Sequence, residues 1–241
     1  MRPTMADYLV FTLAAMIGAM GDLAGHERRG THVWPARSAV LGLLGAATGV
    51  RRDDSAGLAR LDRLSMAVGQ FAQGVAFRDF HTAQTIPAAF GRVDGRADGL
   101  RRAKAAGKLN TVLTQRDYRA GLVHGVALWQ DDSGGDLLAE LADALRQPVF
   151  TLYFGRKACP LAMPPVPRRI TADDAITALG HVALPQFVGA GPWTLGMVAA
   201  DCDLGQGHSE WRHDVPIDRA RWHFAQRQVH LWHNADQGAA S

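Results

Sequence analysis

Apolar residues along this chain fall into short runs, separated by polar and glycine-rich segments. Runs rich in β-branched and aromatic residues are typical of strands, and apolar residues at helical spacing indicate helices. The pattern predicts strands over residues 8–13, 66–71, 111–118, 122–129 and 151–154. It predicts helices over residues 35–48, 58–64, 137–145 and 173–179. This mixture predicts an α+β fold, in which most of residues 180–233 would form further strands.

The helix predicted at 35–48 has clear boundaries and an unusual set of flanking charges. Pro35 suits a first helical turn, and Gly49 suits the position just after the last turn. Cations after the helix are favoured by its dipole, whereas cations before it are not. Those before it therefore predict an anion bound between the preceding loop and the helix start. The flanking cations are Arg28, Arg29, Arg37, Arg51 and Arg52.

A second basic region lies between the predicted strands. Residues 83–110 contain few large aliphatic side chains, and residues 92–119 carry eight Lys and Arg against three Asp, a net charge of +5. The whole chain has a net charge of only +3. We interpret residues 83–112 as an inserted arm that lies along a phosphate backbone. The alternative is a disordered, solvated insertion.

Composition and short motifs limit the cellular location and the kinds of chemistry that the chain can carry out. The apolar run at 9–20 resembles the core of a signal peptide, but Asp7 precedes it and the run is too short to span a bilayer. We therefore expect a buried strand there. Two cysteines, Cys159 and Cys202, make no disulfide framework, so we expect a reducing cytoplasm. Chemistry on phosphates by a Walker loop is excluded because no such motif occurs.

Several stretches occur in one order along the chain. They are YLVF (8–11), PARSAVLGLLG (35–45), GVRRDD (49–54), RDFHT (78–82), Tyr118 followed by VALW (126–129), and YFGRKACPL (153–161). In this order they resemble the CasD family, the subunit that binds the RNA handle in type I-E Cascade, a CRISPR surveillance complex. The resemblance covers residues 8–165 well and the rest weakly.

The resemblance implies a specific architecture. Residues 1–147 would form a ferredoxin-like (RRM-like) RNA-binding core, and the arm at 83–112 would match the family's protruding β-hairpin thumb. A proline-rich connector at 160–169 precedes the rest of a small, mostly β C-terminal subdomain, which we expect over 148–233. Residues 234–241 would form a flexible tail.

The implied function is non-catalytic. The chain would hold the 5′ handle of the crRNA and cap the backbone filament in antiviral defence, with no cofactor, metal or membrane. Its partners would be the backbone and large subunits of Cascade, and target DNA indirectly through the complex. The predicted RNA-binding residues are Arg28, Arg29, Trp34, Arg37, Ser38, Arg51, Arg52, Phe80, His81, Arg101, Arg102, Lys104, Lys108, Arg156 and Lys157.

Other functions remain open at this point. A metal-independent endoribonuclease needs acid–base groups near the 2′-hydroxyl and a cation near the leaving oxygen. The candidates are His26, His32, His81 and Tyr118, with Lys104, Lys108 or Lys157. Relatives in another CRISPR subtype process repeat RNA with a Tyr, Lys and His set. Cys202 and the five histidines after it have spacings that fit no compact zinc site. A protein-only scaffold is the third possibility.

Overall fold

The computed structural model describes residues 5–25, 27–130, 136–186, 193–218 and 223–234. Its strands are β1 (Ala6–Gly18), β2 (Gly21–Ala24), β3 (Arg28–Thr31), β4 (Ser65–Thr85), β5 (Asn110–Trp129), β6 (Arg168–Ala172), β7 (Met197–Ala200), β8 (His208–Asp218) and β9 (His223–His233). Its helices are α1 (Arg37–Thr48), α2 (Ser55–Leu61), α3 (Arg96–Ala105), α4 (Leu137–Arg146) and α5 (Ala175–Leu179), with a 3-10 turn at Ala88–Phe90. The predicted mixture of helices and strands is confirmed, and an antiparallel sheet dominates it.

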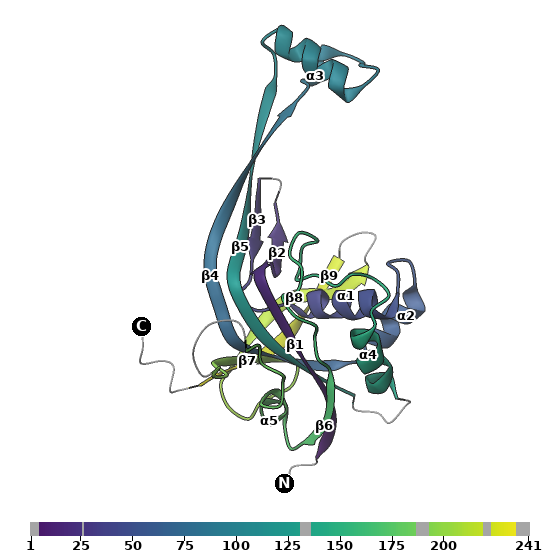
Figure 1. Ribbon diagram of the computed structural model, residues 1–241, viewed down its shortest axis with the longest axis vertical. Helices are drawn as coiled ribbons and strands as arrows, with labels where there is room; N and C mark the ends of the chain where they lie inside the picture. Colours follow the sequence, from purple (N-terminus) through teal and green to yellow (C-terminus); the bar gives the residue numbers. More distant parts are fainter. Residues whose placement is uncertain (1–4, 26, 131–135, 187–192, 219–222, 235–241) are drawn as a thin grey trace.

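The sheet is built outward from β1. This strand pairs antiparallel with β5 on one side and with β6 on the other. β5 pairs with β4, and β7, β9 and β8 follow beyond β4. β3 runs parallel to β5 just beyond the end of β1, and β2 lies outside β3. The element labels and this order can be followed in Figure 1.

Both faces of β1 are buried, which explains its continuous apolar run. Leu9 and Phe11 pack in one core with residues of α1 and α4. Tyr8 and Val10 point to the opposite face and pack with residues of α5 and β7. Successive side chains of a strand alternate between faces, so a strand between two helical layers needs apolar residues at every position. The strand predicted at 8–13 is confirmed, although it extends to Gly18.

α1 ends where its sequence predicts but begins later, because Pro35 lies before the N-cap residue Ala36 and not in the first helical turn. It starts two residues after Pro35, and Gly49 follows it with a φ of 81°, a left-handed conformation that glycine adopts without strain. The main chain at Val149 and Phe150 donates hydrogen bonds to carbonyls in the last turn of α1, which ties the segment after α4 to this helix. In the part of the chain that the structure describes, no helix is both long and apolar enough to cross a lipid bilayer.

β4 and β5 form a long hairpin whose outer half projects from the body (Figure 1). They pair from Ser65↔Trp129 to Thr85↔Asn110, and α3 lies at the tip. We call the part beyond the Arg78↔Asp117 pair, residues 78–117, the arm; it is longer than the arm predicted at 83–112. The prediction of two strands at 111–118 and 122–129 was wrong, because one strand passes through Gly121. The strand predicted at 66–71 continues to Thr85 for the same reason, since each strand supplies the other's hydrogen-bond partners.

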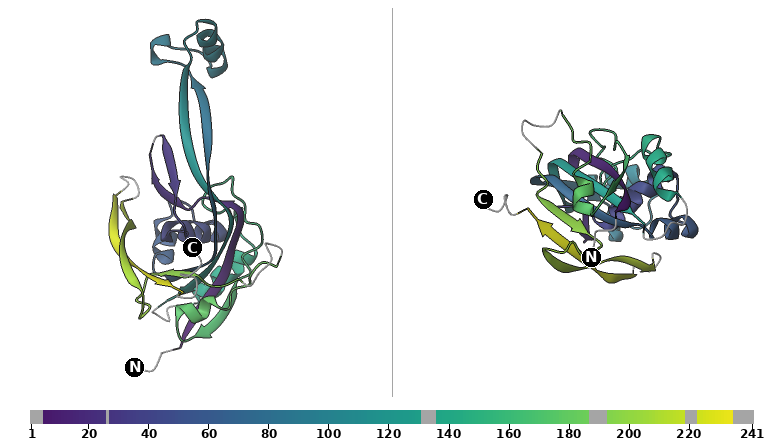
Figure 2. Two further views of the ribbon diagram at one scale, coloured as in Figure 1. Left: turned by 90° about the vertical axis from the view of Figure 1, so that its left-hand side faces the viewer. Right: turned by 90° about the horizontal axis from the view of Figure 1, so that it is seen from below.

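The C-terminal strands extend the same sheet. β7 pairs with β4, and the β8–β9 hairpin curves alongside α1 (Figure 2). The helix predicted near 173–179 is confirmed as α5. The strand predicted at 151–154 was wrong: this segment is a turn with one isolated bridge, Tyr153↔Pro160. The division at residue 147 stays a prediction, and residues 235–241 of the predicted tail lie outside the described ranges.

Candidate nucleic-acid interface

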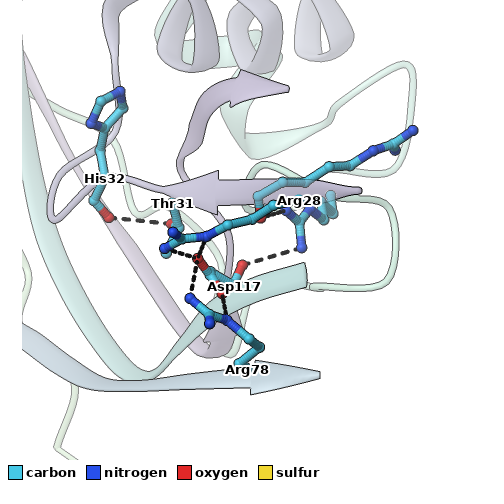
Figure 3. Close-up of polar contacts among 7 residues, drawn as sticks. Arg28, Thr31, His32, Arg78 and Asp117 are labelled. Carbon is cyan, nitrogen blue, oxygen red and sulfur yellow. Dashed lines mark hydrogen bonds and ion pairs between the residues drawn. The ribbon is translucent and has the colours of Figure 1, made fainter. Parts of the chain in front are cut away.

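Asp117 lies in β5 at the base of the arm, where two arginines from the flanking strands reach its carboxylate (Figure 3). Arg28 of β3 donates from Nε and Nη2 to Oδ2 at 2.9 and 2.8 Å, and Arg78 of β4 donates from Nε to Oδ1 at 2.6 Å. Arg78 lies directly opposite Asp117 in the β4–β5 register. The hydrogen bond from Arg78 lowers the pKa of the Asp117 carboxyl, overcoming the effect of burial, and Arg28 acts in the same direction. The carboxylate is therefore ionised at neutral pH.

A turn that packs on the arm base adds a third arginine. Arg156 donates from Nη1 to the Asp117 carbonyl at 3.2 Å and from Nη2 to the Arg29 carbonyl at 3.1 Å. Its guanidinium lies 4.6 Å over the Tyr118 ring, which stacks in turn on Phe77 with 5.4 Å between ring centroids. These contacts fix the turn that carries the predicted RNA-binding residues Arg156 and Lys157 against the arm base.

We define the arm-base cluster as Arg28, Arg29, Arg78, Arg116, Asp117 and Arg156. Arg28, Arg78 and Asp117 lie on one face of the sheet, while Arg29 and Arg116 lie on the other beside Asp79. Five arginines against these two acids still leave a surplus of positive charge. The side chain of Arg28 is 62% exposed, and Arg29 is also exposed. A surplus of this kind at the surface attracts phosphate and raises the rate at which nucleic acid associates.

The tip of the arm forms a second basic surface. Gly99 and Ala103 of α3 are buried, which leaves the cations of this helix on the outside. Asp98 lies 3.6 Å from Arg101 and 4.0 Å from Arg102, both as exposed pairs. Exposed ion pairs contribute about 0–1 kcal/mol, so they do not prevent these arginines from binding another anion. Lys104 and Lys108 are exposed beside them.

An uncharged neck separates the two basic surfaces. Residues 80–91 and 109–115 contain no Asp, Glu, Lys or Arg. Of the cations counted over residues 92–119, Arg116 and Arg119 lie outside the arm predicted at 83–112, and the β4–β5 register places both of them at the arm base. The neck strands, residues 80–85 and 110–115, span about 20 Å at about 3.3 Å per residue. Phe80 and Leu113 are exposed on the neck.

Comparison with known proteins identifies the family. The sequence profile of a family described as CRISPR-associated protein (Cas_Cas5) matches residues 8–230. This chain belongs to the Cas5 family. A curated relative, the CRISPR system Cascade subunit CasD of Escherichia coli (strain K12), is 32% identical over 184 residues, which are 73% of this chain and 76% of the relative. The predicted resemblance to CasD is thus confirmed.

Solved structures agree with the Cas5 assignment. A chain described as "CRISPR RNA-guided surveillance complex" matches with a TM-score of 0.66 and 25% identity, covering 94% of this chain and 90% of that chain. A second, described as "Crystal structure of Cas protein", matches with a TM-score of 0.56 and 22% identity, covering 94% of each chain. The second match supports the fold alone.

The residues predicted to bind RNA occupy several separate places in this Cas5-family chain. The arm base brings together Arg28, Arg29 and Arg156, with Lys157 exposed on the same turn. Phe80 and His81 lie on the neck, where His81 Nε2 is 2.6 Å from an Asp79 carboxylate oxygen. The tip holds Arg101, Arg102, Lys104 and Lys108. The two ends of α1 hold Trp34, Arg37, Ser38, Arg51 and Arg52.

Two of the residues near the start of α1 have protein partners that the sequence does not reveal. Arg37 pairs through Nη1 with the Asp201 carboxylate and donates from Nη2 to the Asp62 carbonyl at 2.8 Å. Its side chain is only 14% exposed. Trp34 is half-buried, and the Arg212 guanidinium lies 4.9 Å from its ring centroid. RNA binding by Arg37 and Trp34 stays a prediction, while their contacts here join α1 to the C-terminal strands.

Two of the candidate acid–base residues, His81 and Tyr118, lie apart in the described part of the chain. His26 lies outside the described residues. His81 and Tyr118 are four register positions apart along the hairpin, about 13 Å at about 3.3 Å per residue. Lys104 and Lys108 lie still farther out, beyond the neck. General acid–base catalysis needs these groups within hydrogen-bond reach of one reacting atom, about 3 Å.

Arg78, Arg116 and Asp117 are the members of the cluster that sequence reasoning missed as site residues. Arg78 was part of a quoted motif, but nothing in the sequence places it opposite Asp117. That position depends on the hairpin register, which a long strand with few charges leaves open. Among the described residues, no group of three or more His, Cys, Asp or Glu side chains is arranged to hold a metal ion.

Proposed function

We propose that this chain is the crRNA-binding subunit of a type I-E Cascade, holding the 5′ handle and capping the backbone filament without cleaving RNA. The observation that carries the proposal is its 32% identity to the Cascade subunit CasD across most of both chains. The match to a chain of an RNA-guided surveillance complex supports it independently. Its partners are then the backbone and large subunits, with target DNA bound through the complex.

The proposed RNA-binding core is ferredoxin-like. The elements β1, α1, β4, β5, α4 and β6 follow one another as strand, helix, strand, strand, helix and strand. Their strands lie in the order β6-β1-β5-β4, with each neighbouring pair antiparallel. This connectivity and order support a split βαβ arrangement, which RNA-binding modules use. α1 and α4 pack together on one face.

Within this proposal, phosphates bind at the arm base and at the tip. Arg28 and Arg29 offer exposed guanidinium groups, and the cations of α3 form the second contact. Phe80 is exposed between them and available to stack on a base. Both cysteines are free thiols, which supports a cytoplasmic location.

A binding experiment tests the proposal. Purified protein is mixed with labelled repeat RNA, either unprocessed or already cut to expose the handle, at two salt concentrations and without metal. We expect retention of the cut RNA, no new fragment, and weaker binding at higher salt because phosphate contacts release counterions. The Arg28→Ala variant should bind about fivefold more weakly, from a loss of about 1 kcal/mol.

The control variant is Arg60→Ala, which removes an exposed arginine of α2 that pairs with Glu140. It should bind like the wild type. A discrete new fragment would instead support the endoribonuclease, and salt-independent binding, or none, would support a protein-only scaffold.

A further inference from the structure

A cleft of about 660 Å³ lies between the β8–β9 hairpin, β4 and the segment before α1. Its lining combines flat rings with side chains that offer hydrogen-bond donors and acceptors. The residues that matter here are Trp34, Gln73, His208, Glu210, His233 and Asn234. Nothing in the proposed phosphate sites uses this cleft.

Two imidazole rings form one wall. His208 and His233 lie on paired strands with their rings nearly parallel, at an interplanar angle of 4° and 6.0 Å between centroids. Trp34 also lines the cleft, but Arg212 lies 4.9 Å from its ring centroid and His32 stacks near it at 6.5 Å, so the His208 and His233 rings are the flat surface offered to a ligand. Flat walls of this kind accommodate planar heteroaromatic groups, which gain stacking energy that a flexible aliphatic group does not.

The polar part of the lining is held in fixed positions. Glu210 Oε2 accepts from Arg212 Nη2 at 2.6 Å, and Glu210 Oε1 lies 3.7 Å from His208 Nε2. Gln70 Nε2 donates to the Val33 carbonyl at 2.9 Å, which holds the segment before α1 against β4. A carboxylate and carboxamides next to flat rings can recognise the edge of a base that presents both N–H groups and carbonyls.

The hairpin that closes the cleft is anchored to the core by charge. Asp201 bridges Arg37 at the start of α1 and Arg227 of β9, the latter at 2.5 Å. Arg227 also pairs with Asp214 of β8 at 2.6 Å. Since these side chains are less than 20% exposed, both strands of the hairpin are fixed against α1 and the cleft keeps its shape.

Two segments lead from the cleft to the arm-base cluster. The Gln73 carbonyl accepts from Arg119 Nε at 2.6 Å, and Arg78 lies five residues farther along β4, about 16 Å at about 3.3 Å per residue. On the other side, Trp34 lies three residues after the end of β3, which carries Arg28 and Arg29. A nucleotide chain with phosphates on those arginines could continue along either segment to the cleft.

We propose that this cleft binds one nucleobase, stacked on the histidine rings and recognised at its edge by Glu210 and Gln73. The proposal rests on the RNA-binding function above, since the bound base would then belong to the RNA. A free nucleotide carries the same base and offers the same chemistry. The cleft would thus add base recognition to a surface that otherwise contacts phosphates.

The test uses a handle RNA and a series of RNAs that each lack one base but keep every phosphate. For the wild type, we expect one position at which loss of the base weakens binding about tenfold, the size of one lost stacking contact. His233→Ala and Gln73→Ala should bind intact and abasic RNA equally. His213→Ala is the matched control, because His213 lies on β8 and bonds Gln226 instead of lining the cleft; it should keep the tenfold difference.

Each result either shows whether the bound base comes from RNA or from a free nucleotide, or overturns the proposal. Competition by the four nucleoside monophosphates, followed through tryptophan fluorescence, distinguishes a free nucleotide from a base within RNA. If RNA binds but every abasic RNA binds like the intact one, and no monophosphate binds, the cleft proposal fails while the RNA-binding function stands. If RNA does not bind at all, but a monophosphate binds the wild type and not His233→Ala, the RNA-binding function fails while the cleft proposal stands.

Discussion

Asp117 controls the arm base because it supplies one negative charge to two arginines. Arg28 and Arg78 reach it from opposite strands, so their guanidinium groups are oriented before any ligand arrives. Since the pKa of Asp117 is lowered first by Arg78 and then by Arg28, this arrangement holds throughout the neutral range. Orientation by a buried acid reduces the side-chain entropy lost when a phosphate binds.

Gly155 allows the neighbouring arginine to reach that site. Its φ is 83°, and a Cβ atom there would lie 1.6 Å from the Ala19 carbonyl oxygen. We expect Gly155→Ala to lower the free energy of unfolding by about 3 kcal/mol, from the left-handed backbone and the clash together. Gly107→Ala is the control, because Gly107 has a φ of 64° but open space around it. Urea unfolding should give it a loss of only about 1 kcal/mol; equal losses would show that the clash relaxes.

His124 makes the stability of the fold sensitive to acid. The ring is buried in β5, with Nε2 3.2 Å from the Val33 carbonyl, and burial lowers its pKa to about 4. Below pH 6.5 the unfolded chain takes up a proton that the folded chain refuses, so stability is lost as pH falls from 6.5 to 4. The loss should approach about 3 kcal/mol at pH 4, at about 1.4 kcal/mol per pKa unit.

The substitution His124→Gln isolates this effect, since an amide can donate to the same carbonyl but does not titrate. Its unfolding free energy should vary with pH less than that of the wild type between pH 6.5 and 4. His181→Gln, at an exposed position, should leave the wild-type pH dependence intact. Identical curves for the wild type and His124→Gln would contradict a buried neutral His124.

At the scale of elements, the arm carries its charge at two ends. Predicting that distribution from the sequence failed for a definite reason. The charges of 92–119 are contiguous in the chain, but a hairpin folds its second strand back, so Arg116 returns to the base while α3 stays at the tip. By contrast, α1, α4 and β1 could be predicted, because their apolar spacing and end residues depend only on nearby positions.

Most of what the sequence leaves open concerns residues whose partners lie on distant segments of the chain. Arg37 seemed free to bind a phosphate, yet its partner Asp201 is 164 residues away. Likewise, β4 pairs with β5 on both sides of the break expected near Gly121, at Ala120 and at Leu122, and a local sequence pattern does not reveal that pairing. The sequence shows that such a residue is charged or is a glycine. It does not show which distant residue it pairs with, and the role of the residue depends on that partner.

The tip makes its own testable contribution to RNA binding. The triple variant Arg101→Ala, Arg102→Ala and Lys104→Ala should lower handle-RNA affinity and reduce the slope of log affinity against log salt by about 2, at about 0.7 per phosphate contact. Folding should be unaffected, because all three side chains are exposed. The matched control removes Arg60, Arg146 and Arg169, which have exposed acidic partners on the body. An unchanged slope in the tip variant would show that the tip does not touch RNA.

At the scale of the whole molecule, the C-terminal strands share both hydrogen bonds and core with the N-terminal part. β6 completes the edge of β1, and β7 pairs with β4. Trp129 of β5 packs in the same core as residues of α5 and β7. The bridge from Arg37 through Asp201 to Arg227 adds a third connection. Although residues 148–233 were predicted as a subdomain, these contacts favour unfolding together with the core.

We therefore expect one cooperative unfolding transition, and Asp201→Asn tests how firmly the parts are joined. Removing this charge leaves Arg37 and Arg227 without their shared carboxylate, which should cost about 3 kcal/mol, as for other broken buried pairs. Hydrogen exchange followed by mass spectrometry should show β1 and β9 losing the same protection in the variant, because each exchanges through global unfolding. If β9 alone loses protection while β1 keeps it, the C-terminal strands unfold as a separate unit, and the boundary predicted at residue 147 marks two units that Asp201 holds together.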